Sequence, residues 1–336
     1  MSEDDILVLK EREVRSLLEG RELELIDTVR ATYEAHAMGR TALPQSAFLC
    51  FPDDSRNRIV ALPAYKGGND PAAGIKWVSS FPGNLDMGLD RASAVVILNS
   101  TKTGRPKALV EGSVISARRT AASAALAAQC LNEQNQISNV GLVGCGVINF
   151  EIIRFLMAIW PDARRFQIFD VDLQRALRFK QKCQEAFDEI DMEIATDIRA
   201  VLSGSLVTSF ATTAATPHIF DLSMCSAEST ILHISLRDLG PDVILSSENI
   251  VDDVDHVCRA QTSIHLAEQS AGHCNFIRCT LPQVLIGAAT ARSNSGRVVV
   301  FSPFGLGILD IAVGQLVYDL ALAQSLGEVI EAFCGP

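Results

Sequence analysis

The stretch SNVGLVGCGVINFEIIRFL, residues 138–156, decides how this chain is interpreted. It predicts an apolar strand that runs into Gly144-x-Gly146 and continues as a helix, the arrangement of a dinucleotide-binding turn. In that turn the first glycine permits a tight bend, and the second lets backbone N–H groups approach a pyrophosphate. The third fingerprint position normally carries a small residue, and here it is Asn149. We expect its amide either to contact a phosphate or to cap a backbone group.

The residues downstream favour a nucleotide site over a plain glycine turn. The segment RFQIFD is a second predicted strand, and it ends in Asp170, where a carboxylate accepts both ribose hydroxyls of an adenosine. Val171 and Asp172 follow, so neither of the next two residues is an arginine for a 2′-phosphate. NAD is therefore favoured over NADP. The fingerprint residues that we expect at the cofactor are Gly144, Gly146, Val147, Ile148, Asn149 and Asp170.

The composition indicates a globular protein with more than one core. The chain has 336 residues, 48% of them hydrophobic, which favours two domains. A net charge of −11 argues against a nucleic-acid or anionic-membrane surface. The start MSEDDILVLKERE is too charged for a signal peptide, and no apolar run of about 18 residues occurs. We expect a cytoplasmic protein that does not contact a membrane.

The nine cysteines are interpreted as reduced core thiols, because no C-x-x-C pair occurs and most lie singly in apolar runs. The densest group of possible ligands lacks the short paired spacings of a structural zinc site, so we expect no metal. Its members are His256, Cys258, His273, Cys274 and Cys279.

The order of predicted elements gives an α/β fold with an unusual domain order. Residues 45–110 consist of short strands and turns, which predict a mixed or antiparallel sheet. From 138 to about 300, strands alternate with helices, the pattern of a parallel sheet built from βαβ units. We expect a Rossmann-type nucleotide domain inserted between the N-terminal part and the C-terminal helix of a mixed α+β domain, with the catalytic cleft between the two. The expected ranges are 1–115 for the substrate-binding and dimerisation domain, 116–304 for the NAD-binding domain, and 305–336 for the returning segment.

Positive charge is concentrated in one part of this acidic chain. Between Arg56 and Arg119 there are ten Lys or Arg and only four Asp or Glu. A solvated surface explains such an excess in the simplest case, and a pocket for a small, multiply negative ligand is the alternative.

Motifs spread over nearly the full length resemble the ornithine cyclodeaminase and mu-crystallin family. They are GIKWVSSFPGN, RASAVVILN, ARRTAASAALAA, VGCGVINFE, HISLRDLGPDVI and GLGILD. Within the family, KWVSSFPGN, GCGVINFEIIRFL, SLRDLGPDVI and DDVDHVCRAQTSIHL are most similar to the dehydrogenase branch of 2,3-diaminopropionate biosynthesis, which is associated with siderophores and nonribosomal peptides. The resemblance implies oxidation of N-(1-amino-1-carboxyethyl)-L-glutamate with NAD, then hydrolysis to 2-oxoglutarate and L-2,3-diaminopropionate.

The same resemblance implies roles for individual residues. Lys76 matches the lysine near the substrate carboxylate and the reacting nitrogen, and Arg119 matches the arginine that binds a carboxylate. Thr120 matches the threonine near the cofactor phosphates. Asp238 matches the aspartate that exchanges a proton with the substrate nitrogen or with water. The remaining candidate cofactor-binding residues are Thr212 and Ser235.

One departure from the family bears on the substrate. Cyclodeaminases carry a glutamate where this chain has Val60, and losing the acid that handles a free amine disfavours ornithine cyclisation. Nearby Arg58 suits another carboxylate, since arginine grips carboxylates through paired N–H bonds. Arg91 has either a structural role or a substrate-binding one. A substrate with three carboxylates would explain the local positive charge.

Several of these residues can also have purely structural roles. Asp238 is also a plausible turn residue before Gly240, and we expect His233 and His256 to be buried or structural. Of Arg118 and Arg119, we expect one to face solvent.

Three other functions remain open, and the family implies a homodimer. An amino-acid cyclodeaminase would produce no net NADH, and an imine reductase or opine-type dehydrogenase would run in the reductive direction. A non-catalytic nucleotide-binding protein is the third, which joint retention of Lys76, Arg119 and Asp238 disfavours.

We expect the dimer to form through the sheet of residues 45–110, on strands such as AVVIL that continue across a two-fold axis.

Overall fold

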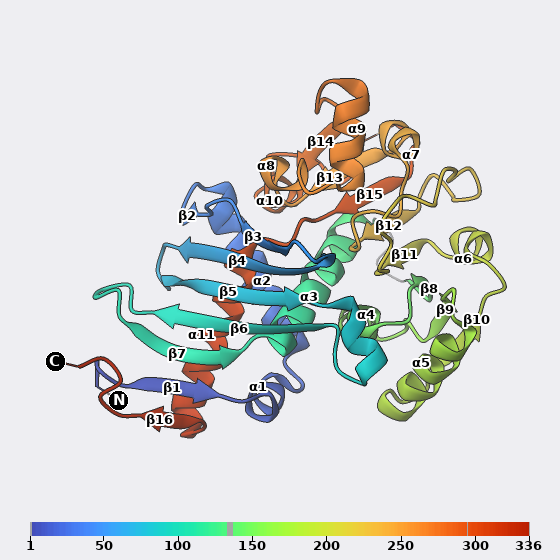
Figure 1. Ribbon diagram of the computed structural model, residues 1–336. Helices are drawn as coiled ribbons and strands as arrows, with labels where there is room; N and C mark the ends of the chain where they lie inside the picture. The colour runs from blue at the N-terminus through green and yellow to red at the C-terminus, as the bar shows by residue number, and fades with distance from the viewer. Residues whose placement is uncertain (1, 133–136, 294, 336) are drawn as a thin grey trace. The chain divides into compact units, whose positions relative to one another are not determined.

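The computed structural model describes residues 2–132, 137–293 and 295–335, and the chain divides into two compact units (Figure 1). The first unit consists of Met1–Arg119 with Leu306–Pro336, and the second of Thr120–Gly305. The division falls inside helix α3 (Ser113–Leu131). The α/β fold class expected from the sequence, with a nucleotide-type domain inserted into a mixed one, is confirmed.

The first unit is built on a mixed sheet of eight strands. Its order is β16-β1-β7-β6-β5-β4-β2, with β3 also paired to β4. The β1–β7 pair is parallel, and the other pairs are antiparallel. The strands are β1 (Ile6–Leu9), β2 (Thr41–Ala42), β3 (Ala47–Phe51), β4 (Asp54–Lys66), β5 (Ala72–Ser80), β6 (Ala92–Asn99), β7 (Pro106–Glu111) and β16 (Glu328–Ile330). The helices are α1 (Glu11–Leu18), α2 (Glu22–Ala37), the short 3-10 helix η1 (Pro82–Met87) and α11 (Gly307–Gln324).

Helix α11 covers one face of this sheet, running behind β4, β5 and β6 in Figure 1. Two glycines allow the close approach. A Cβ on Gly307 would lie 2.8 Å from the Leu62 Cβ, and one on Gly74 would lie 3.2 Å from the Ile311 side chain. By length and composition alone α11 is apolar enough to cross a membrane, but 67% of it is buried inside the protein, as in the core helix of a folded domain.

The opposite face of the same sheet is apolar and only partly covered. Antiparallel registration places Ala61, Trp77 and Val95 side by side on it, and Pro63, Ile75, Ile97 and Leu109 in the next row. Trp77 is 42% exposed and Leu109 36%. None of the helices described for this unit is drawn in front of this face in Figure 1.

The expected route to a dimer through the AVVIL strand is wrong. That segment belongs to β6, which is hydrogen-bonded to β5 on one side and β7 on the other. A strand paired on both sides has no free edge with which to continue across a two-fold axis.

The second unit is a parallel sheet of eight strands in the order β10-β9-β8-β11-β12-β15-β13-β14. The chain leaves β8 toward β9 on one side and later returns to β11 on the other, so a topological switch point lies between β8 and β11. The strands are β8 (Asn139–Val143), β9 (Arg165–Phe169), β10 (Asp191–Ile194), β11 (Val207–Phe210), β12 (Thr230–His233), β13 (Glu248–Val251), β14 (Ile277–Thr280) and β15 (Val299–Ser302). The helices are α4 (Val147–Ile159), α5 (Leu173–Ala186), α6 (Ile198–Gly204), α7 (Pro241–Ser246), α8 (Val254–Val257), α9 (Ser263–Ala271) and α10 (Leu281–Leu285).

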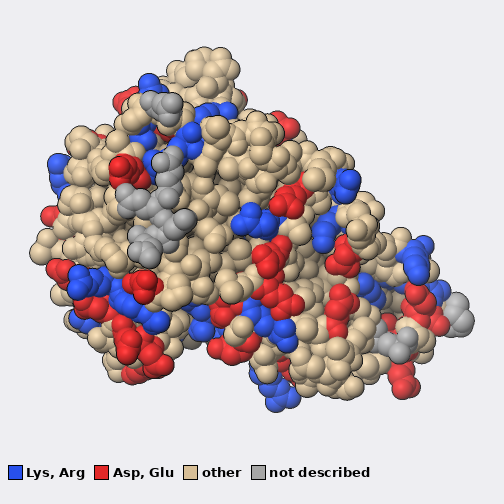
Figure 2. Space-filling model, turned by 180° about the vertical axis from the view of Figure 1, so that it is seen from behind, with Lys and Arg blue, Asp and Glu red and all other residues tan. Residues whose placement is uncertain are grey.

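The surface charges are mixed on the face that Figure 2 shows. Lys and Arg side chains there are interspersed with Asp and Glu side chains. The described part of this face therefore has no extended positively charged surface of the kind that attracts a polyanion.

Candidate active site

The glycine turn lies at the carboxyl end of β8, at the switch point where open α/β sheets bind ligands. Gly144 has φ +93°, and a Cβ there would lie 2.5 Å from the Ala211 carbonyl oxygen. Gly146 is the N-cap of α4, and a Cβ there would meet no atom within 4 Å. A side chain at Gly146 would therefore occupy open space in front of the helix N-terminus, where an anion is stabilised.

Asn149 binds the protein backbone, which is the second of the two uses that the sequence left open for its amide. Its side chain is fully buried, and its amide nitrogen donates to the carbonyl oxygens of Val143 at 3.0 Å and Gly144 at 2.6 Å. Its amide oxygen accepts from Ser209 Oγ at 2.8 Å. Asn149 thus ties the start of α4 to the ends of β8 and β11. The remaining fingerprint residues, Val147 and Ile148, form the first turn of α4, with Val147 59% exposed.

Asp170 follows β9 and faces the glycine turn. Its Oδ2 accepts a hydrogen bond from the Cys145 backbone N–H at 2.9 Å, and its side chain is only 6% exposed. Arg175, which the sequence argument did not consider, is the third residue of α5 and has a terminal nitrogen 3.5 Å from Asp170 Oδ1. The same guanidinium lies 3.8 Å from Asp172. Two carboxylates around one arginine leave a net negative charge, which opposes the 2′-phosphate of NADP.

The space before the α4 N-terminus, the close turn at Gly144 and the enclosed carboxylate of Asp170 each match a part of the pyrophosphate and ribose chemistry. The second unit therefore fits a dinucleotide cofactor.

Asp238 is the centre of a buried hydrogen-bond network, which is more than a turn residue requires. Its Oδ1 accepts from Thr212 Oγ1 at 2.5 Å, its Oδ2 accepts from Ser235 Oγ, and its side chain is 0% exposed. His233 Nε2 lies 3.3 Å from Oδ2 and accepts the Asp238 backbone N–H at 3.1 Å. Burial favours the neutral acid, but the interactions with His233, Ser235 and Thr212 hold the Asp238 pKa below its ordinary value. Asp238 is therefore ionised at neutral pH.

The Asp238 network adjoins the glycine turn. Thr212 follows β11 and Ser235 follows β12, so both lie at the carboxyl ends of neighbouring parallel strands. The close approach of Gly144 is to Ala211 and the Thr212 backbone nitrogen. In this structure the hydroxyls of Thr212 and Ser235, candidate cofactor ligands by sequence, are engaged by Asp238.

Two histidines flank this carboxylate, and sequence reasoning considered only one. His233 is buried, contacts Ser302 Oγ through Nδ1 at 3.1 Å, and supports Asp238, consistent with the structural role expected for it. His218 was not identified, and its Nε2 lies 3.8 Å from Asp238 Oδ1 with 38% of the side chain exposed. The His218 and Ile219 backbone N–H groups donate to the Asp238 carbonyl oxygen at 2.9 Å, beside the bridge between Ile219 and Leu239, and this pairing has no local sequence signal. The other histidine, His256, is half-buried and bonded to Asp253 at 2.9 Å.

In the first unit, Lys76 and Arg119 share one buried carboxylate, that of Asp310 in α11. Lys76 Nζ lies 2.7 Å from Asp310 Oδ2, and Arg119 Nε lies 3.0 Å from Oδ1. The Lys76 and Asp310 side chains are 4% and 0% exposed. Burial, opposed by attraction to Asp310, lowers the Lys76 pKa to about 8. Asp310 belongs to the GLGILD motif, but the sequence argument assigned it no role.

Arg119 keeps donors for a ligand after pairing with Asp310. Its two terminal nitrogens have no hydrogen-bond partner among the described residues, although the side chain is only 8% exposed. Lys76 donates in addition to Ser116 Oγ at 3.3 Å. The expectation that Arg118 or Arg119 faces solvent is wrong, because Arg118 is also buried and donates to the Leu18 carbonyl oxygen and to Glu19. Thr120 is half-buried at the first position of the second unit.

Arg58 lies on the same face of the sheet as Lys76. The β4–β5 register pairs Arg58 with Ser80 and Leu62 with Lys76, so side chains four residues apart project to one side. The separation along the strands is about 13 Å. Val60 lies between them on this face.

Arg91 lies beside Arg58, and both guanidinium groups are half-buried. Burial and the neighbouring Arg58 charge lower the pKa of Arg91. Neither residue makes an ion pair or a side-chain hydrogen bond within the described part of the chain. Two partly buried like charges without an acidic partner form a favourable site for an anion.

The parallel sheet, its glycine turn and Asp170 define a dinucleotide-binding α/β protein, to which the first unit adds a separate group of buried cations. The model of the ornithine cyclodeaminase/mu-crystallin family matches residues 5–325, and the chain belongs to this family. This confirms the resemblance seen in the sequence.

Relatives with assigned activities match over nearly their full length. An alanine dehydrogenase of Archaeoglobus fulgidus is 26% identical, with 98% of this chain and 99% of the relative covered. An N-((2S)-2-amino-2-carboxyethyl)-L-glutamate dehydrogenase of Staphylococcus aureus is 25% identical, with 92% and 93% covered. The solved structure of an archaeal alanine dehydrogenase dimer with bound NAD is 25% identical, has a TM-score of 0.85, and covers 97% of this chain and 99% of its own.

Proposed function

We propose that the protein is an NAD-dependent oxidoreductase that acts on the CH–NH bond of an amino-acid conjugate of glutamate and releases L-2,3-diaminopropionate and 2-oxoglutarate. The observation that carries the proposal is the pair of cationic groups on one sheet face, Lys76 with Arg119 and Arg58 with Arg91. Two such groups suit a substrate with several carboxylates. The similarity to the S. aureus dehydrogenase supports this kind of reaction.

The connectivity of the conjugate needs a correction. In N-(1-amino-1-carboxyethyl)-L-glutamate, the compound expected from the sequence, both nitrogens are on one carbon, so breaking the glutamyl C–N bond would not release a 2,3-diamine. The 2-amino-2-carboxyethyl isomer, which the name of the S. aureus relative contains, places the nitrogens on adjacent carbons. We therefore propose N-(2-amino-2-carboxyethyl)-L-glutamate as the substrate.

Substrate binding depends on the first unit. The open terminal nitrogens of Arg119 bind one carboxylate in a paired geometry, and Lys76 adds a compact charge beside it. Arg58 and Arg91 bind the distal glutamyl carboxylate. Val60 gives the intervening surface no acid with which to hold a free side-chain amine, which disfavours an ornithine-type substrate.

Cofactor binding depends on the second unit. The α4 N-terminus after Gly146 holds the pyrophosphate, and Asp170 holds the ribose hydroxyls. When bound there, NAD would supply the hydride acceptor for oxidation at the glutamyl Cα.

Asp238 is proposed to handle protons during oxidation and hydrolysis. It is ionised at neutral pH. Its two carboxylate oxygens accept hydrogen bonds from the Thr212 and Ser235 hydroxyls, which can relay protons. It takes the proton of the bridging nitrogen as the imine forms, and it then helps water add to the imine carbon. Collapse of that adduct breaks the C–N bond, giving the keto acid and the free amine.

We also propose a cytoplasmic homodimer. The apolar face that carries Ala61, Trp77 and Val95 is the surface on which a second copy would pack. The archaeal alanine dehydrogenase structure, which is a dimer, supports this proposal.

The test is incubation of the purified protein with NAD and the conjugate. NADH absorbance and release of 2-oxoglutarate and diamine should rise together in equal amounts. Ammonia release from ornithine without net NADH would identify a cyclodeaminase, and NADH consumption with a keto acid and an amine would identify a reductase or opine-type enzyme. Absence of turnover with all these substrates, despite NAD binding, would favour a non-catalytic nucleotide-binding protein.

A variant pair tests the distal carboxylate. Arg58→Leu should raise KM for the conjugate by about 10- to 100-fold, because a charged hydrogen bond contributes about 1.5–3 kcal/mol. Arg56→Leu is the matched control on the same strand, since Arg56 is exposed and paired with Asp54 at 2.9 Å. Equal KM values for the two variants would remove Arg58 from the substrate site.

A further inference from the structure

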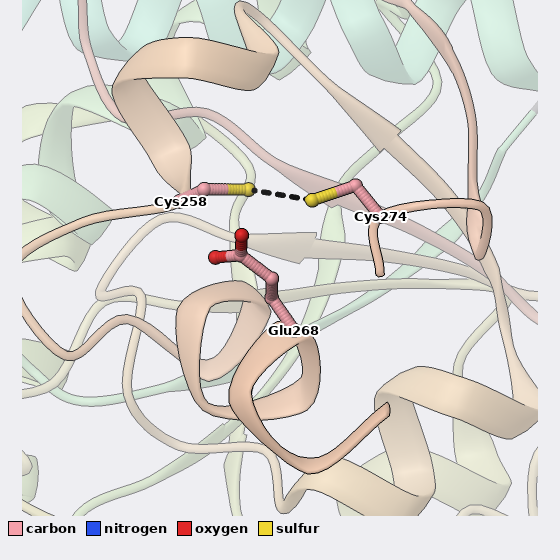
Figure 3. A group of neighbouring side chains, drawn as sticks. All are labelled: Cys258, Glu268 and Cys274. Carbon is pink, nitrogen blue, oxygen red and sulfur yellow. Dashed lines mark hydrogen bonds between the residues drawn. The ribbon is translucent and has the colours of Figure 1, made fainter. Parts of the chain in front are cut away.

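Three possible metal ligands that are separated in the sequence come together in the second unit. Cys258 ends α8, Glu268 lies on α9, and Cys274 follows the turn at Gly272 (Figure 3). Their ligand atoms all lie within 4.8 Å of one another, and each residue is partly buried. The sulfur atoms of Cys258 and Cys274 are 3.5 Å apart. In Figure 3 the carboxylate of Glu268 projects from its helix toward the two sulfurs.

We propose that Cys258, Glu268 and Cys274 form a binding site for a divalent zinc ion. This site is independent of the proposed reaction, and it departs from the absence of metal expected from sequence spacing. That expectation rested on paired C-x-x-C motifs, whereas these three ligands are gathered by the α8 and α9 segments and the turn after α9.

The geometry suits zinc with small adjustments. At a Zn–S distance of about 2.3 Å, sulfurs that are 3.5 Å apart subtend about 100° at the metal, near the tetrahedral value of about 109°. A disulfide needs the sulfurs at about 2.05 Å, a much larger movement. Two thiolates with one carboxylate select zinc over calcium or magnesium, which prefer oxygen ligands. The fourth position is left for water, as in other three-ligand zinc sites.

The local charge also favours a cation. Burial, the Cys274 thiol, and the charges of Glu268 and Asp255 raise the pKa of Cys258 well above its ordinary value, and burial raises the pKa of Cys274. Both groups are therefore thiols in the absence of a cation, and the carboxylate is unopposed within the cluster. Binding of one Zn²⁺ converts both thiols to thiolates and releases two protons to solvent.

The bound ion would cross-link α8, α9 and the turn before β14. These elements are short, since α8 has 4 residues and α9 has 9, so they have little intrinsic stability. A metal that binds only the folded arrangement would stabilise this part of the second unit.

The experiment measures zinc binding to the full chain by equilibrium dialysis. The protein is kept under anaerobic conditions with a phosphine reductant. We expect one ion per chain, an affinity that rises by up to about 100-fold per pH unit because two protons are released, and thiolate-to-metal charge-transfer bands when cobalt replaces zinc. Cys274→Ser and Glu268→Gln should each weaken binding at least tenfold. Cys225→Ser is the matched control, because Cys225 is a partly buried free thiol of the same unit outside the cluster.

Three results would overturn the proposal. They are the absence of stoichiometric binding at micromolar zinc, equal affinity of the cluster variants and the Cys225→Ser control, and cobalt spectra without thiolate bands. Far-ultraviolet circular dichroism of each variant separates a lost ligand from a lost fold.

Discussion

Lys76 offers a quantitative test of the buried cationic site that does not depend on the proposed reaction. Burial, opposed by the charge of Asp310, lowers the Lys76 pKa from 10.5 to about 8. In the unfolded chain the same group titrates near its ordinary value. The perturbation is Lys76→Met, which keeps an unbranched side chain, removes the titrating group, and leaves Asp310 paired with Arg119.

The sign of the effect follows from proton counts. Between pH 8 and 10.5 the unfolded wild-type chain binds more protons at this residue than the folded chain, so its contribution to stability rises with pH. The full difference corresponds to about 3 kcal/mol, which opposes folding below pH 8. The wild type should therefore gain about 1 kcal/mol relative to the Met variant between pH 7 and 9, and about 2–3 kcal/mol by pH 10.

The assay is urea unfolding of both proteins at pH 7, 8, 9 and 10, in which all other titrating groups cancel in the difference. A difference in unfolding free energy that stays within about 0.5 kcal/mol across this range would refute the lowered pKa. A difference that moves in the other direction would mean that Asp310 outweighs burial and raises the pKa.

Three further predictions concern the other sites. Asp238→Asn should keep the fold and NAD binding but lower turnover by about 10²- to 10⁴-fold in stopped-flow assays, whereas near-normal turnover would return Asp238 to a turn role and shift attention to Lys76. Asp170→Ser should weaken NAD and relax discrimination against NADP by calorimetry, and tighter NADP than NAD binding by the wild type would contradict the assignment. By light scattering, the wild type should have the mass of a dimer at micromolar concentration. Trp77→Glu should lower the measured mass, because a charge on the apolar face opposes association. A monomeric wild type would exclude the dimer.

The features predictable from the sequence are those with local signals. The tight turn at Gly144 and the carboxylate of Asp170 depend on residues within one βαβ unit, so their spacing is sufficient to locate them. For Asn149 the sequence left two uses open, because the choice depends on Ser209, which is 60 residues away. Arg175 was missed because a helical turn brings it back to Asp170, whereas the argument considered only the next two residues.

The features that sequence reasoning missed depend on distant pairings. Asp310 lies 234 residues from Lys76 and 191 from Arg119, and only the packing of α11 on the sheet joins them. Periodicity identifies such a helix as a core element, but it does not indicate which polar residue on it meets a buried cation. The same limit applies to His218 and to the Cys258, Glu268 and Cys274 cluster.

The position of Asp310 also bears on how the protein is made. Lys76 and Arg119 leave the ribosome early, and their shared counterion is the 310th of 336 residues, encoded after the whole second unit. Domains generally fold as units during synthesis, yet the first unit lacks α11 until the whole second unit has been translated. Until then two cations face burial without a carboxylate, which is strongly unfavourable. A nascent or prematurely terminated chain is therefore expected to contain a folded second unit and an incompletely folded first unit. Quality-control proteases would recognise such chains through the incompletely folded first unit.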